Sequence, residues 1–308
     1  MANSVVTAAK QLRPEPSANT SVLPSGGPKL TVVILAYNEE VNLPECLNSI
    51  RSLSCHVFVV DSGSNDRTVE IAKESGAGMR YHPFDNYSLQ RNWALANMPF
   101  DTPWVLHLDA DERLTPELVA EINSVMARPN IDADGFLLRK RTIFMGRWIR
   151  HGGHYPSYHL RLFRTGRGRC EDRLYDQHFI VDGPIKPLQN DYMDIVASDI
   201  SSWSLRHVRW AAMEAKEMAV TDDRTGQVAP DVMGNPIERK RWWRKSYGHW
   251  PPFARAFIYW VYRYFVRLGF LDGKEGLIFH YLQGFWFRFL VDALMCERER
   301  NQMIGSLK

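Results

Sequence analysis

The spacing of apolar and polar residues predicts that strands and helices alternate along the first part of the chain. Residues 30–36 form a continuous, largely β-branched apolar run, which is typical of a strand buried on both faces. Residues 41–50 carry apolar positions at roughly helical spacing, with Asn38 as the expected helix cap. A second apolar run, over residues 57–60, ends in Asp61 and leads through a Ser/Gly/Asn turn into another helix. This order of elements predicts an α/β fold built on a parallel sheet.

The same kind of pattern continues to about residue 220. We expect helices over residues 88–97 and 204–220, and strands that end at residue 109 and cover 135–139 and 159–164. The first of these helices carries Gln90, Arg91 and Asn92 in succession. The elements therefore predict a mostly parallel sheet flanked by helices.

Changes in composition divide the chain into four parts. Residues 1–29, rich in Ser, Ala, Asn, Pro and Gly, are expected to be a disordered leader. The α/β domain is expected over residues 30–220, and residues 221–238, with repeated Gly and Pro, are expected to be a linker. Residues 239–308 then form a separate aromatic and basic helical region.

That last region differs from the rest of the chain in charge as well. Residues 239–267 contain eight Lys and Arg and no Asp or Glu, so the overall charge of +3 leaves −5 for the remainder (3 − 8). Residues 242–289 hold 18 of the 37 aromatic residues. A negatively charged partner is therefore expected at one place on the molecule.

The cysteines and the N-terminus indicate the cellular compartment of the protein. The four cysteines include no Cys-x-x-Cys pair and no companion His spacing, so neither a disulfide framework nor a zinc site is expected. A reducing compartment is therefore expected. The N-terminus has no apolar signal segment that would indicate export.

Two carboxylates follow the apolar run 104–108. Because the strand ends at Asp109 and Asp111, both are expected at the carboxyl edge of the sheet, where open α/β folds bind ligands. Paired hard oxygen ligands suit Mg²⁺ or Mn²⁺ that is also held by substrate phosphates. The alternative is a solvated acidic turn that caps the next helix. A haloacid-type phosphatase is disfavoured because Arg113 stands where its motif has Thr or Val, and no Walker or dinucleotide glycine motif is present.

A second acidic segment lies further along, at residues 171–178. Glu171, Asp172, Asp176 and His178 are all candidates for proton transfer there. The alternative is that the acidic pair forms salt bridges with neighbouring arginines. His151, His154 and His159 lack a rigid frame for a metal, so we interpret them as an acceptor-side loop at most.

Three motifs in order carry a resemblance to a known family. They are residues 33–40 (VILAYNEE), residues 59–68 (VVDSGSNDRT) and residues 108–112 (LDADE). Together they resemble the family 2 glycosyltransferases, which have the Rossmann-like GT-A fold and use nucleotide-sugar donors. The resemblance covers about residues 30–210. Within the family, the chain most resembles bacterial enzymes that add sugars to lipopolysaccharide core or to exopolysaccharide intermediates.

The resemblance implies roles for residues of the first two motifs. Asp61 would accept a hydrogen bond from the uracil of a UDP-sugar, with Ala36 and Tyr37 lining the base pocket. A helix cap is the alternative role for Asp61. Glu39 and Arg91 would face the nucleotide, or else be solvated surface charges.

It also implies the metal ligands and the catalytic base. Asp109 would hold the ribose or the metal, and Asp111 would bind the divalent ion that bridges the two phosphates. An inverting transfer needs a carboxylate to take the proton of the acceptor hydroxyl. Asp172 occupies that place in the family pattern, with Glu171 as its substitute.

The C-terminal region predicts an amphipathic helix. At 100° per residue Arg255, Arg263 and Arg267 fall within an arc of about 120°, and apolar residues share the opposite side. The arginines interrupt any membrane span, so the helix is expected to lie in a membrane interface, with the basic run of 239–290 meeting anionic lipid and Trp242, Trp243 and Trp250 as anchors. The alternative is packing on the catalytic domain or on a second subunit. Nucleic acid is not an expected partner.

Together with these residues, the resemblance implies a metal-dependent, inverting glycosyltransferase. Its acceptor is expected to be a lipid-linked glycan, and its location the cytoplasmic face of the cell membrane. The competing interpretation is a non-catalytic membrane-surface scaffold, which would leave the three ordered motifs unexplained.

Overall fold

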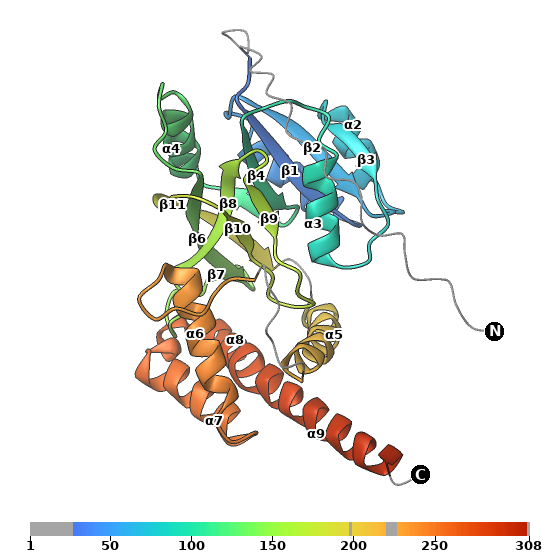
Figure 1. Cartoon of the computed structure of the whole chain (residues 1–308), viewed down its shortest axis with the longest axis vertical. Coiled ribbons are helices and arrows are strands. Elements are labelled where there is room, and N and C mark those ends of the chain that lie inside the picture. Colours follow the sequence, from blue (N-terminus) through green and yellow to red (C-terminus); the bar gives the residue numbers. More distant parts are fainter. Residues whose placement is uncertain (1–26, 197–198, 220–226, 307–308) are drawn as a thin grey trace, which may run out of the picture.

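The computed structural model describes residues 27–196, 199–219 and 227–306, and contains one large mixed sheet followed by a helical region (Figure 1). The predicted α/β fold with a mostly parallel sheet and a C-terminal helical region is confirmed. The disordered leader expected over 1–29 lies outside the described residues except for its last three, as does the first part of the expected linker.

The large sheet begins as a parallel βαβ arrangement and ends as a mixed one. β1 pairs in parallel with β2 on one side and with β4 on the other, whereas β8 is antiparallel to both β4 and β6. In sheet order the strands are β3 (Gly78–Tyr81), β2 (Cys55–Asp61), β1 (Leu30–Ala36), β4 (Trp104–Asp109), β8 (Ser157–Arg164), β6 (Gly135–Phe144), β11 (Ile185–Val196) and β5 (Glu112–Leu114). β7 (Arg147–Trp148) pairs with β6, and β9 (Gly168–Cys170) pairs with β10 (Phe179–Val181) in a separate small sheet.

The reversal of strand order beside β1 fixes where a ligand can bind. The chain runs outward from β1 through β2 to β3 and then returns to the other side of β1 as β4. In open α/β sheets such a switch opens a crevice outside the carboxyl ends of the two strands. The residues that follow β1 and β4 therefore lie at the expected ligand position.

Helices cover both faces of the parallel half. α1 (Leu43–Ser49), α2 (Thr68–Glu74) and α4 (Pro116–Met126) pack on one face with the even-numbered side chains of β1. α3 (Tyr87–Ala96) packs on the opposite face, next to β10. The strand β1 is thus buried on both faces, as its unbroken apolar run predicted.

The expected cap of the first helix is wrong by four residues. α1 begins at Leu43, and its N-cap is Asn42. Asn38 instead has a left-handed backbone (φ 54°), and its side-chain oxygen accepts a hydrogen bond from the backbone N–H of Asn65 at 2.9 Å. Asn is one of the few residues that tolerates this conformation, so Asn38 serves the turn after β1.

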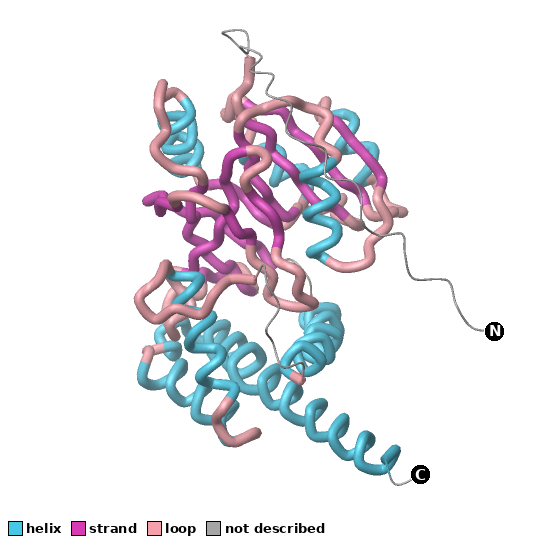
Figure 2. The backbone as a smooth tube through the Cα atoms, viewed as in Figure 1, coloured by secondary structure: helices cyan, strands magenta, loops and turns pink. Residues whose placement is uncertain are grey.

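The remaining helices gather beside the sheet, near β7 (Figures 1 and 2). They are α5 (Ile200–Met218), α6 (Pro236–Gly248), α7 (Ala254–Val261), the π-helical η1 (Tyr262–Val266), the 3₁₀ turn η2 (Gly269–Asp272), α8 (Gly273–Phe279), the π-helical η3 (His280–Trp286) and α9 (Phe287–Ser306). α5 packs against α9 through Ala211, Ala215, Phe287 and Val291. Within the described ranges, no helix is both long and apolar enough to cross a membrane.

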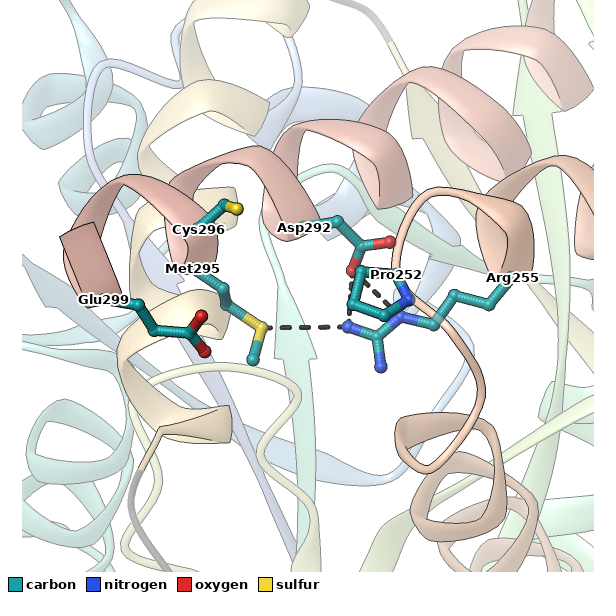
Figure 3. Close-up of a pocket in the computed structure, with 6 residues that line it drawn as sticks. All are labelled: Pro252, Arg255, Asp292, Met295, Cys296 and Glu299. Carbon is teal, nitrogen blue, oxygen red and sulfur yellow. Dashed lines mark hydrogen bonds and ion pairs between the residues drawn. The ribbon is translucent and has the colours of Figure 1, made fainter.

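The orientation of α7 and η1 contradicts the expected role of two arginines. Arg255 is buried and donates to Asp292 on α9 at 2.5 Å, with Met295 also in contact (Figure 3). Arg263 is buried and donates to the carbonyl of Gly152 at 2.9 Å. These two side chains therefore bind the rest of the protein and cannot meet lipid; Arg267 is exposed.

Candidate active site

The loops that follow β1 and β2 are joined by hydrogen bonds. The backbone N–H of Asn38 donates to the hydroxyl of Ser64 at 2.8 Å, and that of Glu39 donates to the hydroxyl of Thr68 at 2.7 Å. The backbone N–H of Arg67 donates to the carboxylate of Glu40 at 3.1 Å. The polar residues of the first two motifs thus hold both loops together at the carboxyl edge of the sheet.

Asp61 ends β2 and organises the turn behind it. Its buried carboxylate accepts from the backbone N–H groups of Gly63 at 2.9 Å and Ser64 at 3.1 Å, and from the hydroxyl of Ser64 at 2.5 Å. Two carboxylate oxygens have about four lone-pair sites, so these three donors leave about one acceptor site. Ala36 is buried at the end of β1, whereas the next residue, Tyr37, is largely exposed, so its ring is open to stacking by an aromatic ligand.

Asp109 is held in its ionised form by two arginines. Arg161 on β8 lies 3.0 Å from its carboxylate, and Arg91 on α3 lies 3.3 Å away. Although burial disfavours the charge, these two cations hold the pKa of Asp109 far below its usual range. Arg91 is buried and stacks over Tyr87 and Phe179, so it is not a solvated surface charge.

Asp111 has the opposite environment. Its carboxylate has no hydrogen bond or ion pair with any residue that the structure describes. Burial, followed by the negative charges of Asp194, Asp109 and Glu112, raises its pKa well above the usual value. Among the described residues no three His, Cys, Asp or Glu side chains converge on one metal position. Asp111 could therefore supply one of the few hard oxygen ligands that Mg²⁺ or Mn²⁺ takes from a protein when substrate phosphates supply others.

Glu39 adds to this negative cluster. Burial raises the pKa of its carboxylate, against the effect of a 2.7 Å hydrogen bond from Asn42, and the charge of Asp109 raises it further. Arg206 on α5 acts in the other direction and lowers it. Glu39 is half-buried and lies within electrostatic reach of Asp109, so it is not a remote surface charge.

Arg161, Lys140 and Asp194 lie outside the three motifs and were not predicted, and Glu112 of the third motif was given no role. Arg161 pairs with Glu112 at 2.5 Å as well as with Asp109, and Glu112 accepts from the backbone N–H of Asp109 at 2.9 Å. Lys140 on β6 pairs with Asp194 on β11 at 2.8 Å. The strand patterns predicted β8 and the first half of β6, but not β11, and no local signal reveals that these three strands lie between β4 and β5 in the sheet.

α3 connects the separate parts of the site through consecutive side chains. Gln90 donates to the hydroxyl of Ser62 at 3.0 Å, and Arg91 pairs with Asp109. Asn92 bonds the backbone of Cys170 twice, accepting from its N–H at 2.8 Å and donating to its carbonyl at 2.9 Å. The segment that follows β9 is thereby attached to the helix that holds Asp109.

That segment contains both carboxylates predicted for the base, in different environments. Glu171 is fully buried and binds Arg241 at 2.5 Å, and it also accepts from the backbone N–H groups of His178 and Val228. The predicted salt-bridge alternative thus holds for Glu171, which is not free to act as a base. Asp172 is exposed, and its carboxylate has no partner in the described part of the chain.

The other candidates in the segment also have structural partners. Asp176 pairs with Arg244 and with Lys240, and these cations hold its pKa well below the usual value despite burial. His178 is buried, which lowers its pKa. Neither group is as accessible to an acceptor as Asp172.

The three histidines of the glycine-rich loop do not lie together around one point. His151 bonds Asp272 at 2.7 Å, and His154 bonds the hydroxyl of Thr142 at 2.8 Å. His159 lies on β8, and its ring faces those of His178 and Tyr192. The first two rings attach the β7 hairpin to the C-terminal helices and to β6.

Comparison with known proteins agrees with this geometry. The sequence model of glycosyl transferase family 2 matches residues 31–191, more than half of the chain, and the chain belongs to that family. An uncharacterised glycosyltransferase of Rickettsia typhi is 38% identical over 147 residues, which cover 48% of this chain and 42% of that protein. The lipopolysaccharide core biosynthesis glycosyltransferase LpsC of Rhizobium meliloti is 26% identical over 265 residues, which cover 82% of this chain and 89% of that protein.

The relatives differ in how much of their length is matched. The chain spans about two fifths of the Rickettsia typhi protein and most of LpsC. Among solved structures, residues 1–349 of S. aureus TarS in complex with UDP are similar, with a TM-score of 0.45 and 14% identity over 89% of this chain and 91% of that one.

Proposed function

We propose that this protein transfers a sugar from a UDP-sugar to a lipid-linked glycan, with inversion at the anomeric carbon. The proposed acceptor is an intermediate of lipopolysaccharide core or exopolysaccharide synthesis, met at the cytoplasmic face of the cell membrane. The observation that carries the proposal is the carboxylate of Asp111, which follows β4 at the switch beside β1 and has no partner in the part of the chain that the structure describes.

The nucleotide is proposed to lie along the joined loops after β1 and β2. The exposed ring of Tyr37 offers a stacking surface, and Asp61 retains acceptor capacity for the imide N–H of uracil. Asp109, kept ionised by Arg91 and Arg161, is suited to accept hydrogen bonds from a ribose. These contacts would orient the donor so that its sugar faces the segment after β9.

Asp111, with Asp109 beside it, is the proposed holder of Mg²⁺ or Mn²⁺. A bound divalent ion would offset the charge that grows on the departing diphosphate. The surplus of carboxylates around Asp111 supports this assignment, because that surplus is costly without a counter-charge.

Asp172 is the proposed catalytic base. The acceptor hydroxyl oxygen forms a bond to the anomeric carbon, the bond from that carbon to the diphosphate oxygen breaks, and the hydroxyl proton passes to Asp172. Support comes from its exposure and from the engagement of Glu171, Asp176 and His178 in the protein's own contacts.

The lipid-linked acceptor is supported by a relative. LpsC, which matches most of the chain, is named for lipopolysaccharide core biosynthesis. Because the identity is 26%, the sugar and the linkage are left to experiment.

Calorimetric titration of UDP tests the donor site. We expect binding in the presence of Mn²⁺ that is lost in excess chelator and in Asp111→Asn, and that is kept in the exposed control Asp101→Asn. Binding that is indifferent to chelator and to Asp111→Asn would refute the metal assignment. A folded protein that binds no UDP at all would favour a non-catalytic membrane-surface scaffold.

A transfer assay tests the base separately. Incorporation of labelled sugar from UDP-hexoses into bacterial lipid extract should fall about 10²–10⁴-fold in Asp172→Asn. UDP binding should stay unchanged, and Asp182→Asn, an exposed carboxylate paired with Arg169 near the same small sheet, should transfer normally. Full activity in Asp172→Asn would exclude it as the base.

A further inference from the structure

The C-terminal helices present an exposed apolar surface. It is formed by Phe257 and Ile258 on α7, Phe265 and Val266 on η1, Leu268 just before η2, and Leu271 on η2, each at least 45% exposed. Single exposed apolar side chains are ordinary, but large ones gathered on successive turns mark an interaction site. We propose that this surface inserts into the interface of an anionic lipid membrane.

The surface faces outward because the opposite side of α7 and η1 is anchored. Arg255 donates to Asp292 and to the carbonyl of Gly248 at 2.8 Å, and Figure 3 shows its guanidinium directed toward α9. Arg263 donates to the carbonyl of Gly152. Rotating the helix to bury its apolar side would leave these buried partners unsatisfied, at a high free-energy cost. The exposure of the apolar side is therefore built into the fold.

The charges around the surface favour anionic lipid. Arg267 lies within it, Lys274 follows it with its side chain 85% exposed, and Arg147 donates to the carbonyl of Leu271 at 3.4 Å. The acidic residues within 247–279 are Asp272, which is buried, and Glu275, which lies near Arg147 and Lys274. The rim is thus cationic, which attracts the negative surface of a membrane.

A second copy of this chain is disfavoured as the occupant. In a twofold dimer the same surface meets itself, so the cations of one rim would face those of the other. Exposed Tyr262 and Tyr281 beside the surface have the apolar ring and polar tip that suit the membrane–water boundary. An anionic lipid surface satisfies both the apolar and the charged groups.

This inference goes beyond the transfer chemistry and needs no nucleotide. It extends the proposed function, because an enzyme docked on a membrane would meet a lipid-linked acceptor there. The proposed transfer function and the proposed membrane docking can fail independently, because UDP binding is measured without lipid and docking is measured without UDP.

Sedimentation with vesicles of phosphatidylcholine, with and without phosphatidylglycerol, tests the docking. The full chain should bind the anionic vesicles, and Phe265→Ser/Val266→Ser should weaken binding at least about 10-fold, given the apolar area removed. Arg267→Gln/Lys274→Gln should weaken it about fivefold per charge and abolish the preference for phosphatidylglycerol. Met233→Ser, which removes an exposed apolar side chain outside the surface, is the matched control.

Two results would overturn the inference. One is equal vesicle binding by the wild type and Phe265→Ser/Val266→Ser, both with normal UDP binding as proof of folding. The other is a concentration-dependent dimer that Phe265→Ser/Val266→Ser dissociates, with no vesicle binding by the wild type. Light scattering on the same samples distinguishes that dimer from a monomer.

Discussion

The guanidinium of Arg161 lies 3.0 Å from the carboxylate of Asp109, although 52 residues separate them in the chain. The contact forms because β8 pairs antiparallel with β4, which brings the middle of one strand to the end of the other. It keeps Asp109 ionised in a buried place. The two carboxylates of the Asp-x-Asp pair therefore differ, because that of Asp111 has no partner within the ranges that the structure describes.

Removing Arg161 should destabilise the protein strongly. Arg161→Met leaves Glu112 and Asp109 short of a buried counter-charge, and breaking a buried pair in this way costs about 3–5 kcal/mol. Denaturant unfolding measures the loss. The control is Arg169→Met, whose partner Asp182 is largely exposed, and it should cost no more than about 1 kcal/mol. Similar losses in both variants would contradict the role given to Arg161.

Asn92 is expected to position the segment that carries Asp172. Asn92→Ala removes both hydrogen bonds to Cys170, so the segment after β9 loses its attachment to α3. We expect kcat for sugar transfer to fall while the Kd for UDP changes little, because Asp61 and Tyr37 are untouched. Asn97→Ala, which loses only a bond to the Trp93 carbonyl within the same helix, should leave both quantities near wild type. A large change in UDP affinity with kcat intact would show that Asn92 acts elsewhere.

A methyl group at Gly152 should be poorly tolerated. Gly152 has a left-handed backbone (φ 69°), and an added Cβ would collide with the ring of His280. Gly146 is in the same hairpin with a similar φ of 77°, but an added Cβ there meets no atom within 4 Å. Gly146→Ala should therefore lower the free energy of unfolding only through backbone strain, by about 1–2 kcal/mol. Gly152→Ala should lower it by about 1–3 kcal/mol more, because of the collision. Thermal unfolding of the two variants measures both losses, and equal losses would show that the ring of His280 moves aside freely.

Buried histidines should make the fold sensitive to mild acid. Burial lowers the pKa of His207 and of His280 to about 4, against 6.5 for the free side chain. Below pH 6.5 the unfolded chain takes up protons that the folded chain does not, so stability is full above that pH and declines as the pH falls toward 4. Each such group contributes a slope of up to about 1.4 kcal/mol per pH unit.

His207→Phe tests this directly, because His207 stacks on Trp203 with ring centroids 3.4 Å apart and an aromatic ring can replace it. Unfolding free energies at several values between pH 4 and pH 7 should show a shallower slope for the variant than for the wild type. Identical slopes would mean that His207 is protonated equally in both states.

Much of the fold could be predicted from local patterns. The unbroken apolar run of residues 30–36 predicted the doubly buried strand β1, and the strand–helix alternation predicted the parallel half of the sheet. At the start of α4, Thr115 caps the helix and Pro116 occupies its first turn, both of which are local signals. The cap of α1 was wrong because Asn38 and Asn42 are both plausible caps, and the contact of Asn38 with Asn65 is not local.

The sequence by itself determined the family, the polar loops after β1 and β2 and the place of the Asp-x-Asp pair, because each depends on residues that are close in the chain. Only the tertiary structure decided that Glu171 is neutralised by Arg241, 70 residues away, and that Asp172 is exposed, with no partner for its carboxylate among the described residues. It also decided which side of α7 faces outward. Helical periodicity separates the arginines from the apolar residues, but only Asp292 and the Gly152 carbonyl, supplied by other elements, determine that the arginines are the buried side.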